Sequence, residues 1–377
     1  MRARRGCFPP PPGALAGDRG VRAGLYAADV ARTGRLGVFP RRHTRFASSR
    51  RERLDTTTMQ PRHNPPLSRS GTCLAMHARL PLWLQMPLAL LLIAANTLAH
   101  TLPLFAVALL KVLLPWSPWR RGCSRMLAGI VESWIAVNSA LIGLMTPTRF
   151  HVEGLDGLRR GGSYLVLGNH QSWVDIPVLQ QVFNRRIPFM RFFLKKQLIW
   201  VPVLGLAWWA LDFPFMQRLD RETLKKHPEL RGSDVEATRR ACARYRGMPV
   251  TVMNFVEGTR FTPGKHAGRA SPFAHLLRPK AGGVAFVLDA MGDALQAILD
   301  VTVVYPGGRP TMMDLLAGRI REVRVQVRER PIPADLQHGD YENDSAFRAR
   351  FQQWVNTLWL EKDALIARML ADATASG

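Results

Sequence analysis

The sequence predicts an α/β domain with a mixed, mostly parallel sheet flanked by helices, preceded by an N-terminal membrane helix or helical pair. From residue 150 onward, short apolar runs alternate with stretches that have helical spacing, which favours parallel strands joined by crossover helices. Before this region, residues 82–110 contain no Asp, Glu, Lys or Arg. With 377 residues, the chain is long enough for one large domain plus appendages.

Residues 1–75 are predicted to form a disordered basic extension. They are rich in Arg, Pro, Gly and Ser, and they bury too little apolar surface to offset the entropy cost of ordering. Their shortage of acidic residues also fits a transit peptide. A further alternative is sequence upstream of a misplaced start codon, with Met59 or Met76 as the true start. We assign this extension no part in the chemistry.

Residues 76–122 are predicted to anchor the chain in a membrane. The uncharged run is long enough for a spanning helix of about 20 residues, and Trp residues and an Arg pair flank it. Pro87 and Pro103 interrupt the run, so a bent span or a re-entrant helical pair fits as well. The main alternative is a buried helix of a soluble protein; a signal peptide fits less well because no cleavage site stands out.

Residues 123–149 form a second apolar stretch at helical spacing, with Glu132 and Asn138 inside it. We expect an interfacial or packing helix there, followed by the α/β domain over residues 150–377. The expected strands are 150–153, 164–167, 187–193, 250–255 and 298–304, and the expected helices are 176–183, 234–246, 280–291 and 345–369. Residues 321–328 alternate between Val and polar side chains, which predicts a half-exposed edge strand with a solvated basic face.

The charge of the chain is strongly basic but uneven. The net charge is +24, and residues 1–79 hold 16 Lys and Arg against 4 acids, so about half of the excess lies there. The sequence has no zinc-finger spacing, no RNP-like strand and no recognisable DNA-binding helix pair, which argues against a nucleic-acid partner. A basic chain with a long apolar segment instead favours anionic membrane surfaces and phosphorylated substrates. The four cysteines have no metal-ligand spacing and are expected to be reduced.

A His and an Asp follow the first fully apolar strand, in the run Asn169-His170-Gln171-Ser172-Trp173-Val174-Asp175. A neutral imidazole can accept a proton near pH 7, and a carboxylate can fix its tautomer and stabilise the imidazolium. Five residues of regular helix turn through about 500°, so the two side chains meet only if His170 precedes the helix. Pro177 is compatible with a first helical turn. The alternative is a loop histidine that caps or packs.

A second strand-to-loop junction, Val250–Phe255, leads into Val256-Glu257-Gly258-Thr259-Arg260. Gly258 allows backbone N–H groups to approach an anion closely, and Arg260 offers a planar fork that matches a phosphate. A carboxylate beside a phosphate would repel it. We therefore expect Glu257 to orient Arg260 or to bind a substrate hydroxyl, the alternative being a surface turn.

Together these runs resemble the glycerolipid acyltransferase family, which includes the 1-acylglycerol-3-phosphate acyltransferases. Asn169–Asp175 is similar to the first sequence block of that family and Phe255–Arg260 to the third, with Val256 where many members carry Pro. Two looser blocks follow the same order, one running from Lys195 to Arg218 and one from Val301 to Pro306. The resemblance covers about residues 150 to 310.

The resemblance implies transfer of a fatty acyl group from acyl-CoA or acyl carrier protein to the free hydroxyl of a lysophospholipid. The favoured acceptor is 1-acylglycerol-3-phosphate, and the product is then phosphatidate. His170 and Asp175 would be catalytic, and Glu257, Gly258, Thr259 and Arg260 would bind the acceptor. Arg218 and Lys280 are second-rank substrate-binding candidates. No metal or cofactor is expected, because no cluster of ligand residues has the required spacing. The expected location is a membrane, the bacterial inner membrane, with the site facing the cytoplasm.

Three alternatives remain at this stage. One is an acyltransferase for another lysolipid head group or for an aminoacyl or sugar acceptor. Another is a non-catalytic membrane adaptor that keeps the fold, although His170, Asp175, Glu257 and Arg260 are all intact. A nucleic-acid binder would rest on net charge alone. Trp200, Trp208 and Trp209 are compatible with an acyl tunnel, a membrane-facing surface or core packing.

Overall fold

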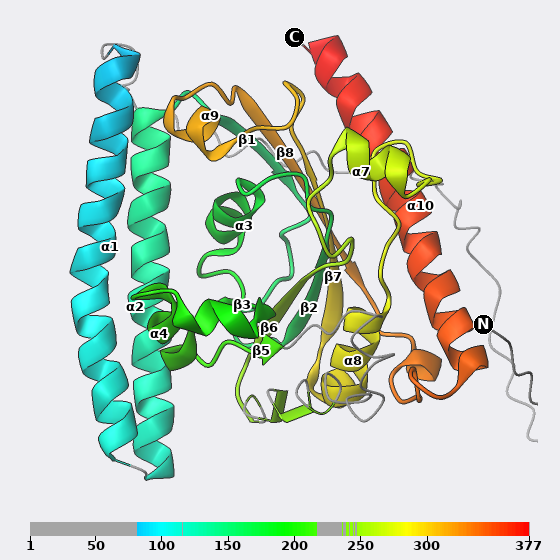
Figure 1. The fold of residues 1–377 in the computed structure, drawn as a ribbon, viewed down its shortest axis with the longest axis horizontal. Coiled ribbons are helices and arrows are strands. Elements are labelled where there is room, and N and C mark those ends of the chain that lie inside the picture. Colours follow the sequence, from blue (N-terminus) through cyan, green and yellow to red (C-terminus); the bar gives the residue numbers. More distant parts are fainter. Residues whose placement is uncertain are drawn as a thin grey trace, which may run out of the picture. The chain divides into compact units, whose positions relative to one another are not determined.

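The computed structural model describes residues 81–114, 116–216 and 247–376, together with positions 236, 239, 240, 242, 243 and 245 (Figure 1). The predicted extension at residues 1–75, most of the predicted helix at residues 234–246, and Arg218 lie outside the described residues. The described residues all belong to one compact unit, residues 63–377. It consists of a helical hairpin and an α/β domain.

The hairpin consists of α1 (Leu82–Leu113) and α2 (Ser117–Met145). Helix α1 continues through both Pro87 and Pro103. Helix α2 begins six residues before the predicted boundary at 123, because Pro118 is accommodated in its first turn. Both helices are long and apolar enough to cross a membrane, by length and composition.

Polar side chains of α1 face α2, and many of its large apolar side chains face outward. Asn96 Nδ2 donates to Asn138 Oδ1 at 2.8 Å, and Trp134 Nε1 donates to Thr97 Oγ1 at 3.1 Å. On the outward side, Leu98 and Leu102 are exposed. This is the reverse of the pattern that a water-exposed hairpin would show.

The sheet confirms the predicted mixed, mostly parallel arrangement. Its strand order is β1-β8-β7-β2-β6-β3, and every neighbouring pair is parallel except β7 and β8. The strands are β1 (Arg149–Glu153), β2 (Tyr164–Gly168), β3 (Met190–Phe192), β6 (Thr251–Phe255), β7 (Ala297–Val304) and β8 (Glu322–Arg330). A second, two-stranded sheet pairs β4 (Leu194–Lys195) with β5 (Phe215–Met216).

The prediction of an edge strand at residues 321–328 is wrong. Strand β8 lies between β1 and β7, so it is hydrogen-bonded on both sides. Its Val side chains are buried, as the alternation predicts. Its basic face, however, is covered by helix α10: Arg324 Nη1 donates to the carbonyl of Met369, and Arg330 pairs with Asp300 and Glu361. Alternation of apolar and polar residues predicts which side chains of a strand are buried. It does not predict whether the strand lies at the edge or in the middle of the sheet.

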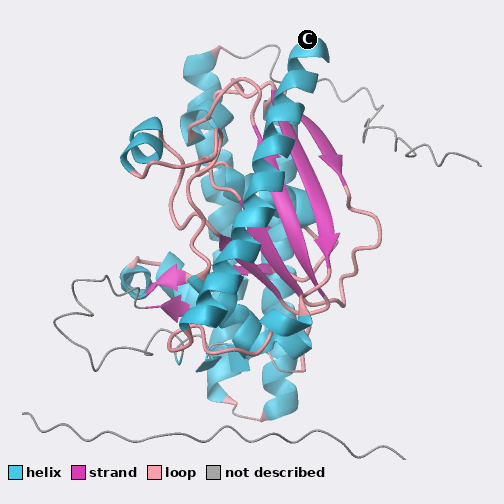
Figure 2. Cartoon of the chain, turned by 90° about the vertical axis from the view of Figure 1, so that its right-hand side faces the viewer, coloured by secondary structure: helices cyan, strands magenta, loops and turns pink. Residues whose placement is uncertain are grey.

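Helices cover both faces of the sheet. The described helices of the domain are α3 (Asp175–Phe183), α4 (Leu204–Ala210), α7 (Pro263–Gly268), α8 (Gly282–Met291), α9 (Met312–Leu316) and α10 (Ser345–Ser376), with a 3-10 turn η2 at Lys196–Trp200. Of these, α3 packs on one face of the sheet, and α8 and α10 pack on the other. Figure 1 shows α3 and α10 on opposite sides of the sheet, and Figure 2 shows α10 running across it.

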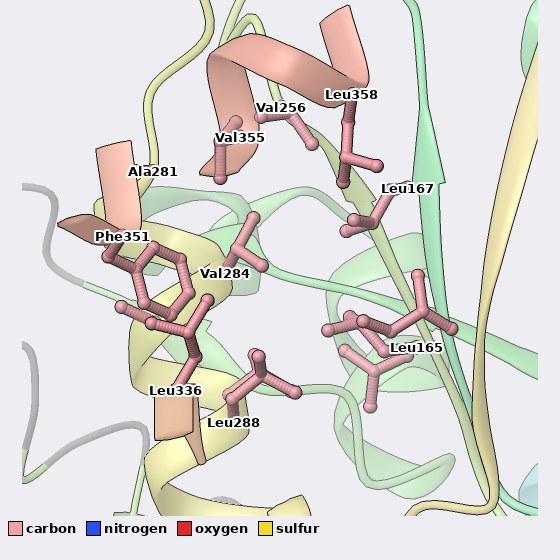
Figure 3. Packing of buried hydrophobic residues seen from close by; sticks show 14 of the residues in the cluster. Leu165, Leu167, Val256, Ala281, Val284, Leu288, Leu336, Phe351, Val355 and Leu358 are labelled. Carbon is pink, nitrogen blue, oxygen red and sulfur yellow. The ribbon is translucent and has the colours of Figure 1, made fainter. Parts of the chain in front are cut away.

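Strand β2 connects the two halves of the core because its successive side chains point to opposite faces. Leu165 and Leu167 pack against α8 and α10, where Val284 and Phe351 contribute to the same cluster (Figure 3). The intervening side chains, such as Val166, pack against α3 instead. A strand buried on both faces has little freedom to shift, so the residues that follow it are held in place.

Candidate active site

The two sequence motifs meet at the carboxyl ends of neighbouring parallel strands. Gly168 of β2 lies opposite Phe255 of β6, so the loops after them leave the sheet side by side. The backbone N–H of His170 donates to Glu257 Oε1 at 3.0 Å, and the N–H of Phe261 donates to the carbonyl of His170 at 2.7 Å. This edge of a parallel sheet is where such folds place their ligand sites.

His170 and Asp175 form a hydrogen-bonded pair. Nδ1 of the imidazole lies 2.8 Å from Asp175 Oδ2, and His170 precedes α3 while Asp175 is its first residue, as the helical geometry requires. Bonding to a carboxylate assigns the proton to Nδ1 and leaves the lone pair on Nε2. The His170 ring stacks on Phe255 with centroids 3.9 Å apart, and its side chain remains 12% exposed. The ring is therefore held rigidly but can be reached.

The Asp175 carboxylate is fully buried and receives several donors. Oδ2 also accepts the backbone N–H groups of Gln171 at 2.7 Å and Ser172 at 2.9 Å. Oδ1 accepts the hydroxyl of Tyr305 at 2.7 Å. Together with the imidazole, these three donors hold the buried carboxylate in one orientation.

Tyr305 is a site residue that the sequence reasoning did not select. It follows β7 directly and is almost fully buried. Burial, followed by the negative charge of Asp175 and the hydrogen bond to it, raises the pKa of Tyr305 well above its usual value, so its hydroxyl remains a donor. The available signal was a phenol placed directly after a mostly apolar strand, where its hydroxyl must find a buried partner.

Asn169 closes the sheet just before the site. Its side-chain amide donates to the carbonyl of Val303 and accepts the N–H of Val303, both at 2.9 Å. The amide therefore pairs with β7 as a backbone peptide group would. This contact fixes the residue immediately before His170.

Glu257 occupies a different place from the one expected. It is fully buried; Oε1 accepts the N–H of His170, and Oε2 accepts the N–H of Leu277 at 2.9 Å. The expectation that it orients Arg260 or binds a substrate hydroxyl is therefore wrong, because the carboxylate is turned into the protein to satisfy backbone groups. Burial raises the pKa of Glu257 to about 7, although the two N–H donors act in the opposite direction.

Gly258 brings its loop against Lys280. It has φ +67°, a left-handed conformation, and a Cβ there would lie 3.2 Å from Lys280 Cδ. The backbone N–H of Lys280 donates to the carbonyl of Val256 at 2.8 Å, which holds the two segments together. Lys280, predicted on weaker grounds, is thus brought next to the Glu257–Arg260 motif.

Two further cations lie along this loop. The guanidinium of Arg260 sits 4.5 Å from the centre of the Trp173 ring, which belongs to the His170 loop. Lys265 Nζ donates to Thr259 Oγ1 at 2.8 Å and to the carbonyl of Arg260 at 3.2 Å. Thr259 is therefore bound to a lysine of the protein. We call residues 256–280 the cationic loop, because this segment carries Arg260, Lys265 and Lys280.

Val256 stands where many members of the resembled family carry Pro, and the structure gives it a definite contact. Its backbone N–H donates to the carbonyl of Gly168 at 3.3 Å, and its side chain is buried. A proline would lack that donor. Among the described residues, no three or more His, Cys, Asp or Glu side chains cluster as metal ligands do.

Comparisons with known proteins point to one family. The Acyltransferase family model matches residues 149–306. The human 1-acyl-sn-glycerol-3-phosphate acyltransferase gamma is 32% identical over 184 residues, which cover 45% of this chain and 43% of that protein. Lysocardiolipin acyltransferase 1 of Danio rerio is 30% identical over 257 residues, which cover 63% of this chain and 60% of that protein. The chain thus spans about half the length of these relatives.

Among solved structures, the 1-acyl-sn-glycerophosphate acyltransferase PlsC of Thermotoga maritima superposes with a TM-score of 0.46 at 14% identity, covering 78% of this chain and 98% of that one. Residues 149–306, which hold His170, Asp175 and the Glu257–Arg260 motif, match the Acyltransferase family model and are similar in sequence to glycerolipid acyltransferases.

The raised pKa of Glu257 predicts a pH-dependent stability. A buried carboxyl that titrates at about 7, against 4.5 ordinarily, binds its proton more tightly when folded. The free energy of unfolding should therefore be highest below pH 4.5 and fall by about 3 kcal/mol as the pH rises through 7. Replacement by Gln removes this titration, although its amide nitrogen then faces a backbone N–H. Denaturant unfolding of the wild type and Glu257→Gln across this pH range measures the difference, and parallel pH profiles would contradict it.

Proposed function

We propose that this protein transfers a fatty acyl group from acyl-CoA or acyl carrier protein to the free hydroxyl of 1-acylglycerol-3-phosphate, giving phosphatidate. The observation that carries the proposal is the His170–Asp175 pair at 2.8 Å, reachable at the ring and placed beside the cationic loop. The family match and the name of the human relative support the substrate class. Another lysophospholipid is the second candidate, because the Danio rerio relative that matches over more of the chain is named for lysocardiolipin.

In this mechanism, His170 acts as the general base. Nε2 accepts the proton of the acceptor hydroxyl while the hydroxyl oxygen bonds to the thioester carbonyl carbon. The tetrahedral intermediate collapses, the C–S bond breaks, and the thiolate leaves as the new ester forms. The imidazolium returns the proton to the sulfur or to water. Asp175 stabilises the imidazolium, and Tyr305 together with two backbone N–H groups holds the carboxylate.

The cationic loop would bind the phosphate of the acceptor. Arg260 provides a planar fork, and its position over Trp173 fixes the guanidinium beside the His170 loop. Lys280 lies against Gly258, where the left-handed backbone leaves the approach open. A phosphate held there would place the glycerol hydroxyl near Nε2, so binding also orients the reacting group. Glu257 would support this site from inside the protein, because its carboxylate fixes the backbone at His170 and at Leu277.

The hairpin supports attachment to one leaflet of a membrane. The α/β domain contacts α1 near both ends: Leu316 of α9 packs with Ala89, and Lys111 pairs with Asp212. These positions are about 33 Å apart along the helix, close to the roughly 30 Å thickness of a hydrocarbon core. An upright crossing would draw the domain into the bilayer. We therefore place the hairpin along the surface, with exposed Leu side chains such as Leu98 and Leu102 in lipid. The Arg120-Arg121 pair favours the cytoplasmic face.

Removing the base provides the direct test. His170→Ala should lower the turnover rate about 100-fold or more without unfolding the protein, because the alcohol then attacks without a positioned proton acceptor. The matched control is His338→Ala. His338 is an exposed histidine outside the candidate site, and its Nε2 lies 3.0 Å from Asp293 Oδ1. Transfer of labelled acyl groups from acyl-CoA to a panel of lysophospholipids measures the rate and names the acceptor. Normal turnover in His170→Ala would exclude the mechanism.

The tyrosine contact predicts a separate effect on rate. Tyr305→Phe removes one donor from the Asp175 carboxylate, so the His170 ring is less firmly oriented, and turnover should fall about 10-fold with little change in KM. Tyr341→Phe, remote from the pair, is the control. An unchanged turnover rate in Tyr305→Phe would show that Tyr305 only packs in the core.

Arg260→Lys tests which substrate the cationic loop binds. The substitution keeps the charge but loses the planar fork, so the KM for the lysophospholipid should rise by about 10-fold or more, while that for acyl-CoA changes much less. Arg350→Lys is a matched control, because Arg350 also lies over an aromatic ring, Phe347, but on α10. A rise in the acyl-CoA KM alone would assign Arg260 to the donor phosphates instead.

A further inference from the structure

The segment after β4 exposes an unusual amount of apolar surface. Within residues 196–210, made up of η2 and α4, six large apolar side chains are at least about one-third exposed, and Trp200 is 85% exposed. The six are Ile199, Trp200, Val203, Leu204, Leu206 and Trp209. Clustered exposure of this kind marks an interaction site. None of these side chains has a role in the mechanism above.

The opposite face of the same segment packs against the hairpin. Ala207, Trp208, Ala210 and Leu211 pack into a cluster with Leu104 and Val107 of α1 and with residues of α2. Lys111 Nζ pairs with Asp212 Oδ2 at 2.6 Å and also donates to the carbonyl of Ala210 at 3.3 Å. The segment is fastened to the hairpin, so it cannot rotate to bury its exposed face.

The backbone of this segment also fixes the exposed side chains in place. A Cβ at Gly205 would lie 2.0 Å from the carbonyl oxygen of Ile199, so only glycine permits this tight turn between η2 and α4. Val203 adopts φ +65°, which is rare for a β-branched residue. The apolar side chains are therefore presented outward by a constrained turn.

The chemistry of the surface indicates its partner. Exposed Lys195 and Lys196 lie at the start of η2, and basic residues beside exposed Trp side chains suit the headgroup region of an anionic bilayer. The final turns of α1, against which α4 packs, expose Leu109, Leu110 and Leu113 as well. The two apolar surfaces belong to elements in direct contact.

We propose that η2 and α4 insert into the interface of a bilayer containing anionic phospholipid, as a second attachment beside the hairpin. This rests on the membrane association proposed above. The segment begins shortly after Phe192, whose ring lies 6.1 Å from Phe255, the ring that stacks on His170. Insertion would bring the lipid surface close to the reacting imidazole, so that a lysophospholipid and its product need not leave the bilayer.

Site-specific labelling tests the insertion without relying on activity. The four native cysteines are changed to Ala, and a fluorophore sensitive to polarity is attached to Trp200→Cys in the full chain, reconstituted with phosphatidylcholine vesicles with or without phosphatidylglycerol. Leu102→Cys on α1 reports on the hairpin. Leu360→Cys is the matched control, since Leu360 is an equally apolar, exposed residue on α10, across the sheet from the hairpin.

We expect the labels at 200 and 102 to shift to shorter wavelength and to be quenched by nitroxide on lipid chains, while the label at 360 is not. Quenching at 200 should increase with phosphatidylglycerol and lose that increase in Lys195→Gln/Lys196→Gln. A lipid response at 102 with a water-like response at 200 would overturn the insertion alone. A water-like response at both would overturn the membrane association as well. A shift at 200 without lipid quenching would indicate a protein partner and also overturn the insertion.

Discussion

The hydrogen bonds of the buried Glu257 carboxylate support the rest of the site. One oxygen accepts the N–H of His170, 87 residues earlier in the chain, and the other accepts the N–H of Leu277, 20 residues later. A carboxylate has no proton to donate, so it can satisfy backbone N–H groups from both sides at once. The histidine loop and the segment that leads to Lys280 are thereby held in one arrangement. The Glu257 side chain has no contact with solvent, so burying its charged form costs free energy. Its raised pKa reflects that cost.

Much of the domain could be predicted from the sequence because its central strands are short and consist mostly of apolar residues. Tyr164–Gly168, Thr251–Phe255 and Ala297–Val304 have few competing structures, and parallel pairing then forces the loops after them together. His170 and Asp175 were predictable as a pair because they match the first sequence block of the resembled family. Helical geometry then required His170 to precede the helix, as it precedes α3. The predictions failed where neighbours in space decide the outcome. The order of strands placed β8 inside the sheet, and a long-range backbone donor turned Glu257 inward.

The missed role of Tyr305 has the same origin. Its hydroxyl reaches Asp175 only because β7 lies beside β2, a relation across 130 residues that no local pattern contains. The hairpin shows the complementary case. Composition revealed its apolar length, but the direction of its polar side chains appears only when α2 is in place to accept them. The outward apolar face therefore follows from pairing between helices, and the sequence of α1 alone has no means of specifying it.

Asn169 limits which residues this position of the chain can accept over evolutionary time. Its amide donates to and accepts from a single residue of β7, Val303, so both functions of one side chain are in use. Aspartate would offer two acceptors and leave a carbonyl facing a negative oxygen, while leucine would leave two buried backbone groups unpaired. Glutamine has both groups but one methylene too many for the space between two adjacent strands. Few substitutions are therefore tolerated at this position, even though the Asn169 side chain takes no part in the proposed proton transfer.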